Sequence, residues 1–181
     1  MEDGELVARA RGGDDGAFGE LVRRHELNVR RLATGLLGDP VEAEDAAQEV
    51  FLKAYEHMGS FRGDASFSTW IHRIAVNHCR DMLRRRARRP WLSWDGLVEA
   101  LGREPVSPAA RPDQATGRAE AGDVLQRLLR DLPAQHRAVL LLRELNGLSY
   151  HEIADVLHIS LDAVKARLRR ARQAATLWNL Q

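Results

Sequence analysis

Residues 149–172 read SYHEIADVLHISLDAVKARLRRAR, and this stretch carries the clearest structural signal in the chain. Ser149 and Glu152 have the spacing of a capping box, which predicts the start of a helix. Ser160 can cap a second helix that begins at Leu161, after only a short turn. The first helix carries an apolar packing set: Ile153, Ala154, Val156 and Leu157. Two helices joined in this way predict a helix-turn-helix.

The second of these helices has one apolar side and one basic side. The apolar stripe, which we expect to be buried, consists of Leu161, Val164, Leu168, Ala171 and Ala175. Five basic residues and no acid occur between positions 164 and 172, namely Lys165, Arg167, Arg169, Arg170 and Arg172. Such side chains reach phosphates and guanine edges when a helix lies in the major groove, and the small Ala166 lets the backbone approach. The alternative is a solvated basic face on an ordinary helical hairpin; the unmixed charge favours DNA binding.

The other patterned segments of the chain also predict helices. Apolar residues recur at mostly three- and four-residue spacing in 17–37, 40–58 and 69–88, and again in 123–132 and 133–145. No strand pattern of any length appears. The predicted fold class is therefore all-α.

The helical pattern breaks between residues 90 and 122, where four of the six prolines occur. We therefore predict two small helical domains, residues 1–89 and 123–181, joined by a linker at 90–122. Some 30 linker residues span roughly 100 Å when fully extended, so the two domains need not touch. Trp91 and Trp94 are too apolar for a solvated tether, and they indicate that part of the linker docks on the first domain or on a partner.

The composition is that of a soluble globular protein with balanced charge. The 181 residues include 27 basic and 26 acidic side chains, which gives a formal charge of +1. Cys79 is the only cysteine, and this excludes an intramolecular disulfide and a zinc site built from several cysteines. No apolar run approaches the roughly 18 residues of a transmembrane helix, and the N-terminus lacks the apolar core of a signal peptide. We expect a cytoplasmic protein.

No catalytic or metal-binding cluster can be assembled from the sequence. His72 and His78 are six residues apart, which differs from the i, i+4 spacing of two metal ligands on one helix face. There is no Gly-rich phosphate loop, and no nucleophile, base and orienting residue can be matched to one another. We therefore expect no metal, no cofactor and no enzymatic activity.

The segment 40–58 is acidic, which makes it a poor surface for DNA. Its acids, set against the single Lys53, are Glu42, Glu44, Asp45, Glu49 and Glu56. Two interpretations stay open at this point: a docking face for a basic partner protein, or an ordinary solvated face.

The segment 60–89 combines aromatic residues, an amide and clustered arginines. Residues 70–89, WIHRIAVNHCRDMLRRRARR, contain seven arginines and one acid. Aromatic and amide side chains bind unstacked bases, and arginines hold the backbone, so this composition suits capture of single-stranded DNA. Trp70 begins the apolar stripe, so we expect it in the core. Phe61 lies in a polar loop and is the better candidate for a base contact.

Together these motifs resemble extracytoplasmic-function sigma factors, the minimal bacterial sigma factors with regions 2 and 4 only. AFGELVRRH at 17–25 is similar to the start of region 2. AEDAAQEVFLKAY at 43–55 resembles the segment that docks on the clamp helices of the RNA polymerase beta-prime subunit. FRGDASFSTWIHRIAVNHCRD at 61–81 is similar to the segment that melts and reads the −10 element. The run LPAQHRAVLLLRELNGLSYHEIADVLHISLDAVKARLRRAR at 132–172 is similar to region 4, which binds the −35 element.

The resemblance implies roles for individual residues. The positions that match the polymerase-docking motif are Asp45, Gln48, Glu49 and Phe51, the last of which can support the motif from the core. Those that match the pocket for a flipped −10 base are Phe61, Arg62, Gly63 and Asn77, with Arg80, Arg84 and Arg85 on nearby phosphates. The expected −35 contacts are Lys165, Ala166, Arg167, Arg169, Arg170 and Arg172. Asp162-Ala163 stands where relatives often carry a Gly-Thr-like pair, so the −35 sequence preference stays undefined.

The function that the resemblance implies is that of a dissociable specificity subunit. Its partners are core RNA polymerase, promoter DNA and an anti-sigma factor that holds the protein inactive. A DNA-binding response regulator or repressor is the alternative. Such a protein dimerises to read paired half-sites, and the stretch 91–101 or the tail TLWNL could supply the dimer helix. A nucleic-acid enzyme is disfavoured because the catalytic cluster is missing.

Overall fold

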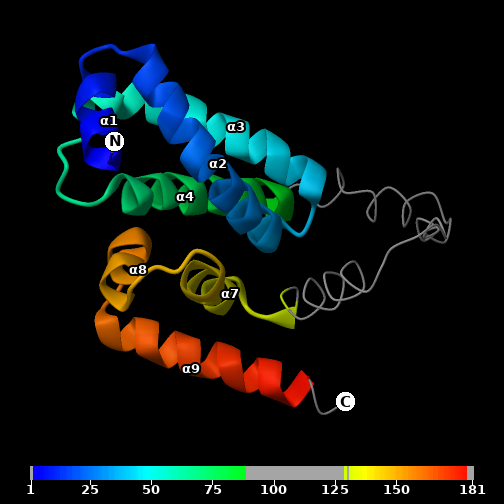
Figure 1. The fold of residues 1–181 in the computed structure, drawn as a ribbon. Coiled ribbons are helices and arrows are strands. Elements are labelled where there is room, and N and C mark those ends of the chain that lie inside the picture. Colours follow the sequence, from blue (N-terminus) through cyan, green and yellow to red (C-terminus); the bar gives the residue numbers. More distant parts are fainter. Residues whose placement is uncertain (1, 89–128, 130, 179–181) are drawn as a thin grey trace, which may run out of the picture.

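The computed structural model describes residues 2–88, 129 and 131–178, and every regular element in these ranges is a helix (Figure 1). This confirms the all-α prediction. The helices form two groups. The first group consists of α1 (Asp3–Arg11), α2 (Asp15–Leu37), α3 (Pro40–His57), the short η1 (Met58–Ser60) and α4 (Phe67–Arg88). The second group consists of α7 (Ala134–Leu140), the π-helical η3 (Leu141–Leu145), α8 (Tyr150–Leu157) and α9 (Leu161–Trp178).

Local signals in the sequence define most of the helix ends. Gly38 ends α2 in the left-handed conformation, with φ 76°. Asp39 then caps α3, because its carboxylate accepts hydrogen bonds from the backbone N–H groups of Val41 (2.8 Å) and Glu42 (3.2 Å). The Ser66 hydroxyl accepts from the N–H of Thr69 at 3.0 Å in the first turn of α4. Both capping side chains lie within three residues of the groups that they cap.

The capping box predicted at the start of α8 is also present. The Glu152 N–H donates to the Ser149 hydroxyl at 3.3 Å, and the Ser149 N–H donates back to the Glu152 carboxylate at 2.8 Å. Ser160 accepts from the N–H of Ala163 at 3.2 Å in the first turn of α9. The helix-turn-helix prediction is thereby confirmed as local structure.

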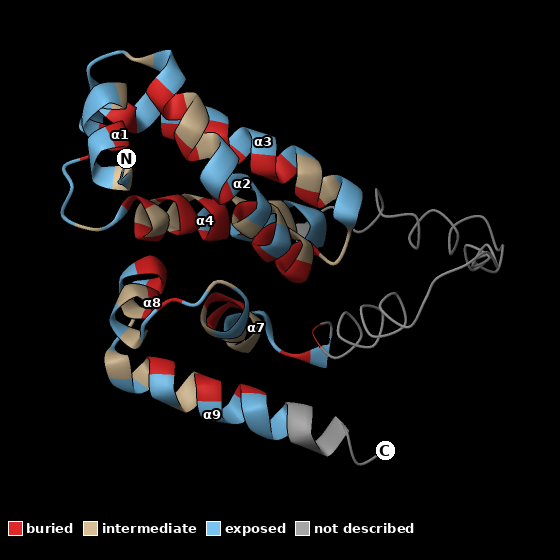
Figure 2. Ribbon diagram, viewed as in Figure 1, coloured by how far each residue is buried: buried red, intermediate tan, exposed pale blue. Residues whose placement is uncertain are grey.

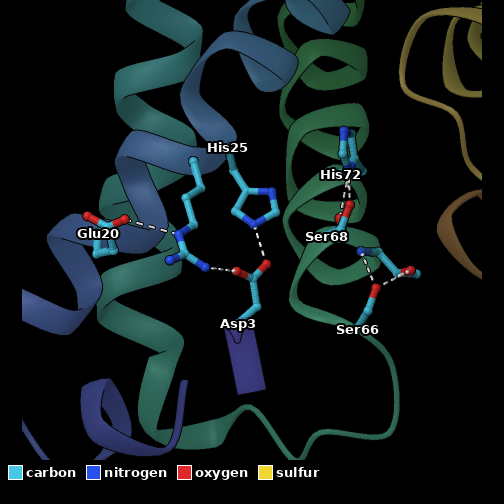
Figure 3. Close-up of polar contacts among 8 residues, drawn as sticks. Asp3, Glu20, His25, Ser66, Ser68 and His72 are labelled. Carbon is cyan, nitrogen blue, oxygen red and sulfur yellow. Dashed lines mark hydrogen bonds and ion pairs between the residues drawn. The ribbon is translucent and has the colours of Figure 1, made fainter. Parts of the chain in front are cut away.

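Helix α1 has no counterpart among the predicted helices. It has nine residues and buries only Leu6 and Val7, so it is too short for an apolar period to be recognised. Long-range polar contacts hold it on α2. The Asp3 carboxylate lies 2.6 Å from His25 Nε2 and accepts from Arg24 at 3.1 Å (Figure 3). Burial opposes ionisation of Asp3, but the hydrogen bonds from His25 and Arg24 outweigh it and lower the pKa of this carboxyl.

Each group of helices has an apolar interior. In the first group, α2, α3 and α4 bury the side chains Leu21, Val29, Leu32, Val50 and Ile71, with exposures of 0–1%. In the second group, α9 packs across α7 and α8, and the buried side chains are Val139, Leu142, Ile153, Val156, Val164 and Leu168. Figure 2 shows the buried positions in red, alternating along the helices with exposed positions in pale blue.

The two groups lie against each other, with α4 packed on α8 (Figure 1). The sequence predicts domains at 1–89 and 123–181, and both predicted boundaries fall outside the described residues. The same is true of the predicted linker 90–122 with Trp91 and Trp94, of most of the helix predicted at 123–132, and of the end of the tail. Among the described helices, none combines the length and the apolar character needed to cross a membrane.

Candidate protein and nucleic-acid interfaces

The polymerase-docking residues predicted on α3 divide between its surface and its core. Asp45, Gln48 and Glu49 are exposed. Phe51 is only 7% exposed and belongs to the apolar core. It therefore can support this face from beneath but offers no surface of its own to a partner.

Three exposed apolar side chains on α3 were missed from the sequence. Val41, Leu52 and Tyr55 are 73%, 57% and 52% exposed. Together with Asp45 and Gln48 they follow the four- and three-residue spacing of a single helix stripe. We call these five residues the α3 stripe. Its apolar residues do not fall on the helix side that carries the buried residues of α3. Helix periodicity could therefore have predicted their exposure from the sequence.

An exposed stripe that mixes large apolar side chains with an acid suits contact with another protein. The Tyr55 hydroxyl donates to Asp15 at 2.7 Å, which ties one end of the stripe to the start of α2. This hydrogen bond and the nearby charge of Asp15 raise the pKa of Tyr55. The Tyr55 side chain of the α3 stripe is thus oriented by Asp15 in the free protein.

The residues predicted to contact −10 DNA lie mostly on the exposed side of α4. Asn77, Arg80, Arg84 and Arg85 are exposed. Arg84 lies 3.6 Å from Asp81 in an exposed ion pair. Such surface pairs have little strength, so the guanidinium groups stay available to an anionic ligand.

Phe61, the candidate for a base contact in the loop before α4, is only 7% exposed. Its contact with a base stays a prediction. Its ring lies 4.8 Å from the Trp70 ring and 6.5 Å from the Phe67 ring, centroid to centroid. The loop is short, and it folds this ring back onto the start of α4. Arg62 and Gly63 are exposed, with Gly63 at φ 80°.

Trp70, which the sequence assigns to the core, is only partly buried. Its ring covers Phe61 and stands in contact with Phe67 at 5.8 Å. The aromatic side chain that this loop leaves partly open to solvent is therefore Trp70 rather than Phe61.

The predicted −35 residues follow the amphipathic pattern of α9. Val164, Leu168 and Ala171 are buried, as predicted. The basic side chains on the solvent side are Lys165, Arg169, Arg170 and Arg172, whereas Ala166 and Arg167 are partly buried. Two of the exposed cations have acidic neighbours: Lys165 lies 3.9 Å from Asp162, and Arg172 lies 2.6 Å from Glu144. The face presented to solvent is basic.

His72 and His78 both lie on α4 but in different environments. His72 is fully buried, and its Nδ1 lies 2.6 Å from the backbone oxygen of Ser68 (Figure 3). Burial lowers the pKa of His72 despite this hydrogen bond. His78 Nδ1 lies 2.6 Å from the Lys53 ammonium on α3, and burial together with that cation lowers the pKa of His78. In the described part of the chain no three His, Cys, Asp or Glu side chains are grouped to hold a metal ion.

A cavity of about 420 Å³ lies where the two groups of helices meet. Arg80 from α4 and Arg167 from α9 both line it, beside Cys79. Its other walls are mostly apolar and include Leu36, Val76, Leu83, Ala138, Leu157 and Ile159. One residue predicted to bind −10 DNA and one predicted to bind −35 DNA therefore share a single cavity.

Two protein families match the chain. The family described as Sigma-70 region 2 matches residues 21–89. The family described as Sigma-70, region 4 matches residues 122–174. The first match covers α3, α4 and most of α2, and the second covers the helix-turn-helix.

Curated relatives match over almost the whole chain. The RNA polymerase sigma-H factor of Pseudomonas aeruginosa is 38% identical over 176 residues, which are 96% of this chain and 91% of the relative. The ECF RNA polymerase sigma-E factor of Escherichia coli strain K12 is 36% identical over 177 residues, 96% of this chain and 92% of the relative.

Two solved structures have a similar fold. One is described as "Structure of CnrH in complex with the cytosolic domain of CnrY". It matches with a TM-score of 0.74 at 27% identity and covers 99% of this chain and 98% of the solved one. The other is the sigma factor RpoE in complex with the anti-sigma factor NepR from Bartonella quintana. It matches with a TM-score of 0.70 at 24% identity over 89% of this chain and 95% of the solved one.

Proposed function

Because the chain belongs to the sigma-70 family as an extracytoplasmic-function sigma factor, we propose that it binds core RNA polymerase and directs promoter-specific initiation. The carrying observation is that one chain presents an exposed acidic and apolar stripe on α3 and exposed basic faces on α4 and α9. The first surface suits a protein and the other two suit DNA. A specificity subunit requires such separate surfaces for the polymerase and for DNA.

We assign polymerase docking to the surface formed by Asp45, Gln48, Glu49, Leu52 and Tyr55. Its chemistry fits the beta-prime clamp helices that the resemblance implies, because acidic side chains attract a basic partner and exposed apolar side chains add contact area. Phe51 acts beneath this surface by packing in the core.

We assign the −10 element to α4 and the loop before it. Asn77 offers an amide to an unstacked base, and Arg62, Arg80, Arg84 and Arg85 offer charge to the phosphates. Gly63 lets the loop turn, and Phe61 supports Trp70 from below. We assign recognition of the −35 element to residues on α9, namely Lys165, Ala166, Arg167, Arg169, Arg170 and Arg172.

We also propose that an anti-sigma factor is a regulatory partner of this protein. We propose the cytoplasm as the place of both, because polymerase and promoter are found there. Two observations support this partner. CnrH, a similar chain, is held in its solved structure by the cytosolic domain of a second protein. RpoE, which shares the fold, is bound there to an anti-sigma factor.

Run-off transcription with purified core polymerase tests the proposed function. Added protein is expected to produce transcripts from its own promoters and to co-elute with core polymerase. If neither transcripts nor co-elution is observed, the proposed function is contradicted.

Single substitutions then test which residues act in core binding and which act in open-complex formation. Leu52→Ala is expected to weaken core binding about tenfold, because a large interface side chain is lost. Leu145→Ala is the matched control, since Leu145 is a 39% exposed leucine outside the α3 stripe. Asn77→Ala is expected to reduce open-complex formation while core binding is kept. If Leu52→Ala and Leu145→Ala bind core equally, the surface formed by Asp45, Gln48, Glu49, Leu52 and Tyr55 is not the docking surface.

A further inference from the structure

The cavity between the two groups of helices has the composition of a ligand pocket. Its volume of about 420 Å³ lies within the roughly 300–1,000 Å³ that is usual for sites that bind small organic molecules. Such sites have mostly apolar walls and a few polar groups that orient the ligand. Here the walls come from α2, α4, α7, α8 and the turn after α8, and the polar side chains are Arg80, Gln135 and Arg167. The cavity therefore meets the general requirements of a binding site.

The apolar walls of the cavity are aliphatic. Among the described residues, no Phe, Tyr or Trp lines it, so it offers no ring on which a nucleotide base or another aromatic ligand can stack. Cys79 belongs to the same walls and is fully buried. Burial raises the pKa of this thiol to about 12, so it is neutral and behaves as a small apolar group. Walls of this kind suit an aliphatic chain.

The two guanidinium groups at the cavity are not paired with acids of the described chain. No acid lines the cavity, and the ion pairs and side-chain hydrogen bonds of the described residues include neither Arg80 nor Arg167. A neighbouring group responds to this charge: burial lowers the pKa of His136, and the charges of Arg170 and Arg167 lower it further. A guanidinium binds a carboxylate through two parallel hydrogen bonds, and low-dielectric surroundings strengthen the attraction. The charge at the cavity is therefore complementary to an anionic group.

The charged and apolar parts of the lining differ in their access to solvent. Arg80 is exposed and Arg167 is partly buried, whereas Val76, Cys79 and Leu157 are buried. The cavity thus reaches the surface beside the cations, and its apolar walls lie deeper. A ligand that matches this order has an anionic head and an aliphatic tail.

We infer that the cavity binds an amphipathic organic anion of the fatty-acid class, with its carboxylate at Arg80 and Arg167 and its aliphatic chain against the apolar walls. An inorganic anion makes no use of these walls, and a neutral hydrocarbon makes no use of the two guanidinium groups. The inference does not depend on the proposed function, because the free protein can bind a small ligand without polymerase or DNA.

Isothermal titration calorimetry of the full-length chain with dodecanoate, below its micelle concentration and at neutral pH, tests the inference. We expect saturable binding of one dodecanoate per chain. Dodecyltrimethylammonium has the same tail with a cationic head, and acetate has the same head without the tail. Both are expected to bind at least about tenfold more weakly than dodecanoate. No saturable binding of dodecanoate, or equal binding of dodecyltrimethylammonium, would overturn the inference.

Two pairs of arginine variants test the position of the carboxylate. Arg80→Gln and Arg167→Gln each remove one cation from the cavity, and each is expected to weaken dodecanoate binding about tenfold, because a charge-assisted hydrogen bond is lost. Arg84→Gln on α4 and Arg169→Gln on α9 are the matched controls, since both arginines are exposed and lie outside the cavity lining. Their affinities are expected to equal that of wild type. If the cavity variants bind as tightly as the controls, the carboxylate is not held there.

Ala138→Leu tests the position of the aliphatic chain. Ala138 is a buried residue of the cavity lining, so the larger side chain narrows the cavity and is expected to weaken dodecanoate binding at least about tenfold. Ala174→Leu makes the same change at an exposed position of α9 and is expected to bind as wild type does. Equal affinities of the two variants would contradict the inference. Circular dichroism checks that both fold; if Ala138→Leu does not, the arginine pairs and the comparison of head groups decide.

Free fatty acids and anionic phospholipids share this head and tail chemistry. Helices of both groups bound the cavity, so a chain must leave a bilayer before it can enter. Vesicles of dioleoylphosphatidylglycerol distinguish the two sources, and we expect that the protein does not sediment with them. Sedimentation with these vesicles, together with no binding of dodecanoate, would overturn the inference in favour of a membrane-surface contact.

Discussion

At the scale of single residues, His72 shows how burial sets electrostatic behaviour. The imidazole is fully buried on α4, with its Nδ1 on the Ser68 backbone oxygen at 2.6 Å. Burial is the largest influence on the pKa of His72 and lowers it. The hydrogen bond to the Ser68 backbone oxygen raises this pKa, the proximity of His25 lowers it, and the charge of Glu152 raises it, but burial prevails. His72 is therefore held neutral in the folded protein.

This neutrality predicts a loss of stability in acid. The unfolded chain takes up a proton near the ordinary histidine pKa of about 6.5, whereas the folded chain does so only at lower pH. The free energy of unfolding is thus expected to fall as pH drops below about 6.5, measured by urea denaturation at pH 7.5 and pH 5.5. His72→Asn can keep the hydrogen bond to Ser68 and is expected to reduce this decline.

His151→Asn is the control for the acid experiment, because His151 is exposed on α8. It is expected to leave the decline as in wild type. The lowered pKa values of His78 and His136 account for the part of the decline that remains in His72→Asn. An unchanged decline in His72→Asn would contradict the assignment.

At the scale of elements, the helix-turn-helix depends on how α8 begins. α8 is only eight residues long, and isolated helices of that length are unstable in water. The reciprocal hydrogen bonds of Ser149 and Glu152 satisfy backbone N–H groups that the helix itself cannot. The same carboxylate accepts from Thr69 on α4, so one acid serves both the helix and the contact between the two groups of helices.

Ser149→Ala is expected to lower the free energy of unfolding by about 1 kcal/mol, since it removes the N-cap acceptor. Chemical denaturation followed by circular dichroism measures this. Ser60→Ala is the matched control: the Ser60 hydroxyl is exposed and donates to the His57 backbone oxygen, outside any helix N-cap. A loss for Ser149→Ala no larger than that for the control would show that the capping box adds nothing.

At the scale of the whole molecule, Arg137 connects the two groups of helices. Its guanidinium donates to the Leu36 backbone oxygen across the contact and to the Leu132 backbone oxygen within its own group. Arg137→Ala leaves the Leu36 oxygen without this donor. Separation of the groups, which exposes that oxygen to water, is therefore less costly than in wild type.

Small-angle X-ray scattering is expected to show a larger radius of gyration for Arg137→Ala than for wild type. Arg23→Ala is the control, because Arg23 is an exposed arginine whose described ion pair is with Glu20 on its own helix. Identical scattering from wild type and both variants would mean that Arg137 does not hold the groups together.

The secondary structure was largely predictable because its signals are local. Asp39, Ser149 and Ser160 each lie within three residues of the groups that they cap, so the sequence alone indicated these helix ends. The basic side of α9 follows from helix periodicity in the same way. Helix α1 escaped prediction because its anchor on α2, the contact between Asp3 and His25, spans 22 positions of the chain.

The candidate surfaces were predictable only in part. Which residue types gather on α3, α4 and α9 follows from the sequence, and so does the resemblance to sigma factors. The burial of Phe61 could not be predicted, because it depends on Trp70 and Phe67, whose rings the fold brings against it. Leu52 was missed although helix periodicity places it off the buried side of α3, where it is 57% exposed.

The contact between the two groups of helices depends entirely on tertiary structure. Gly35 looks like a weak point in a helix until Leu141, more than a hundred positions later in the chain, is seen against it. Arg80 and Arg167 look like independent DNA contacts until they are seen to line one cavity. Helix caps and amphipathic faces arise from neighbours in the chain, whereas the contact between the two groups arises from packing between distant segments, which no local pattern encodes.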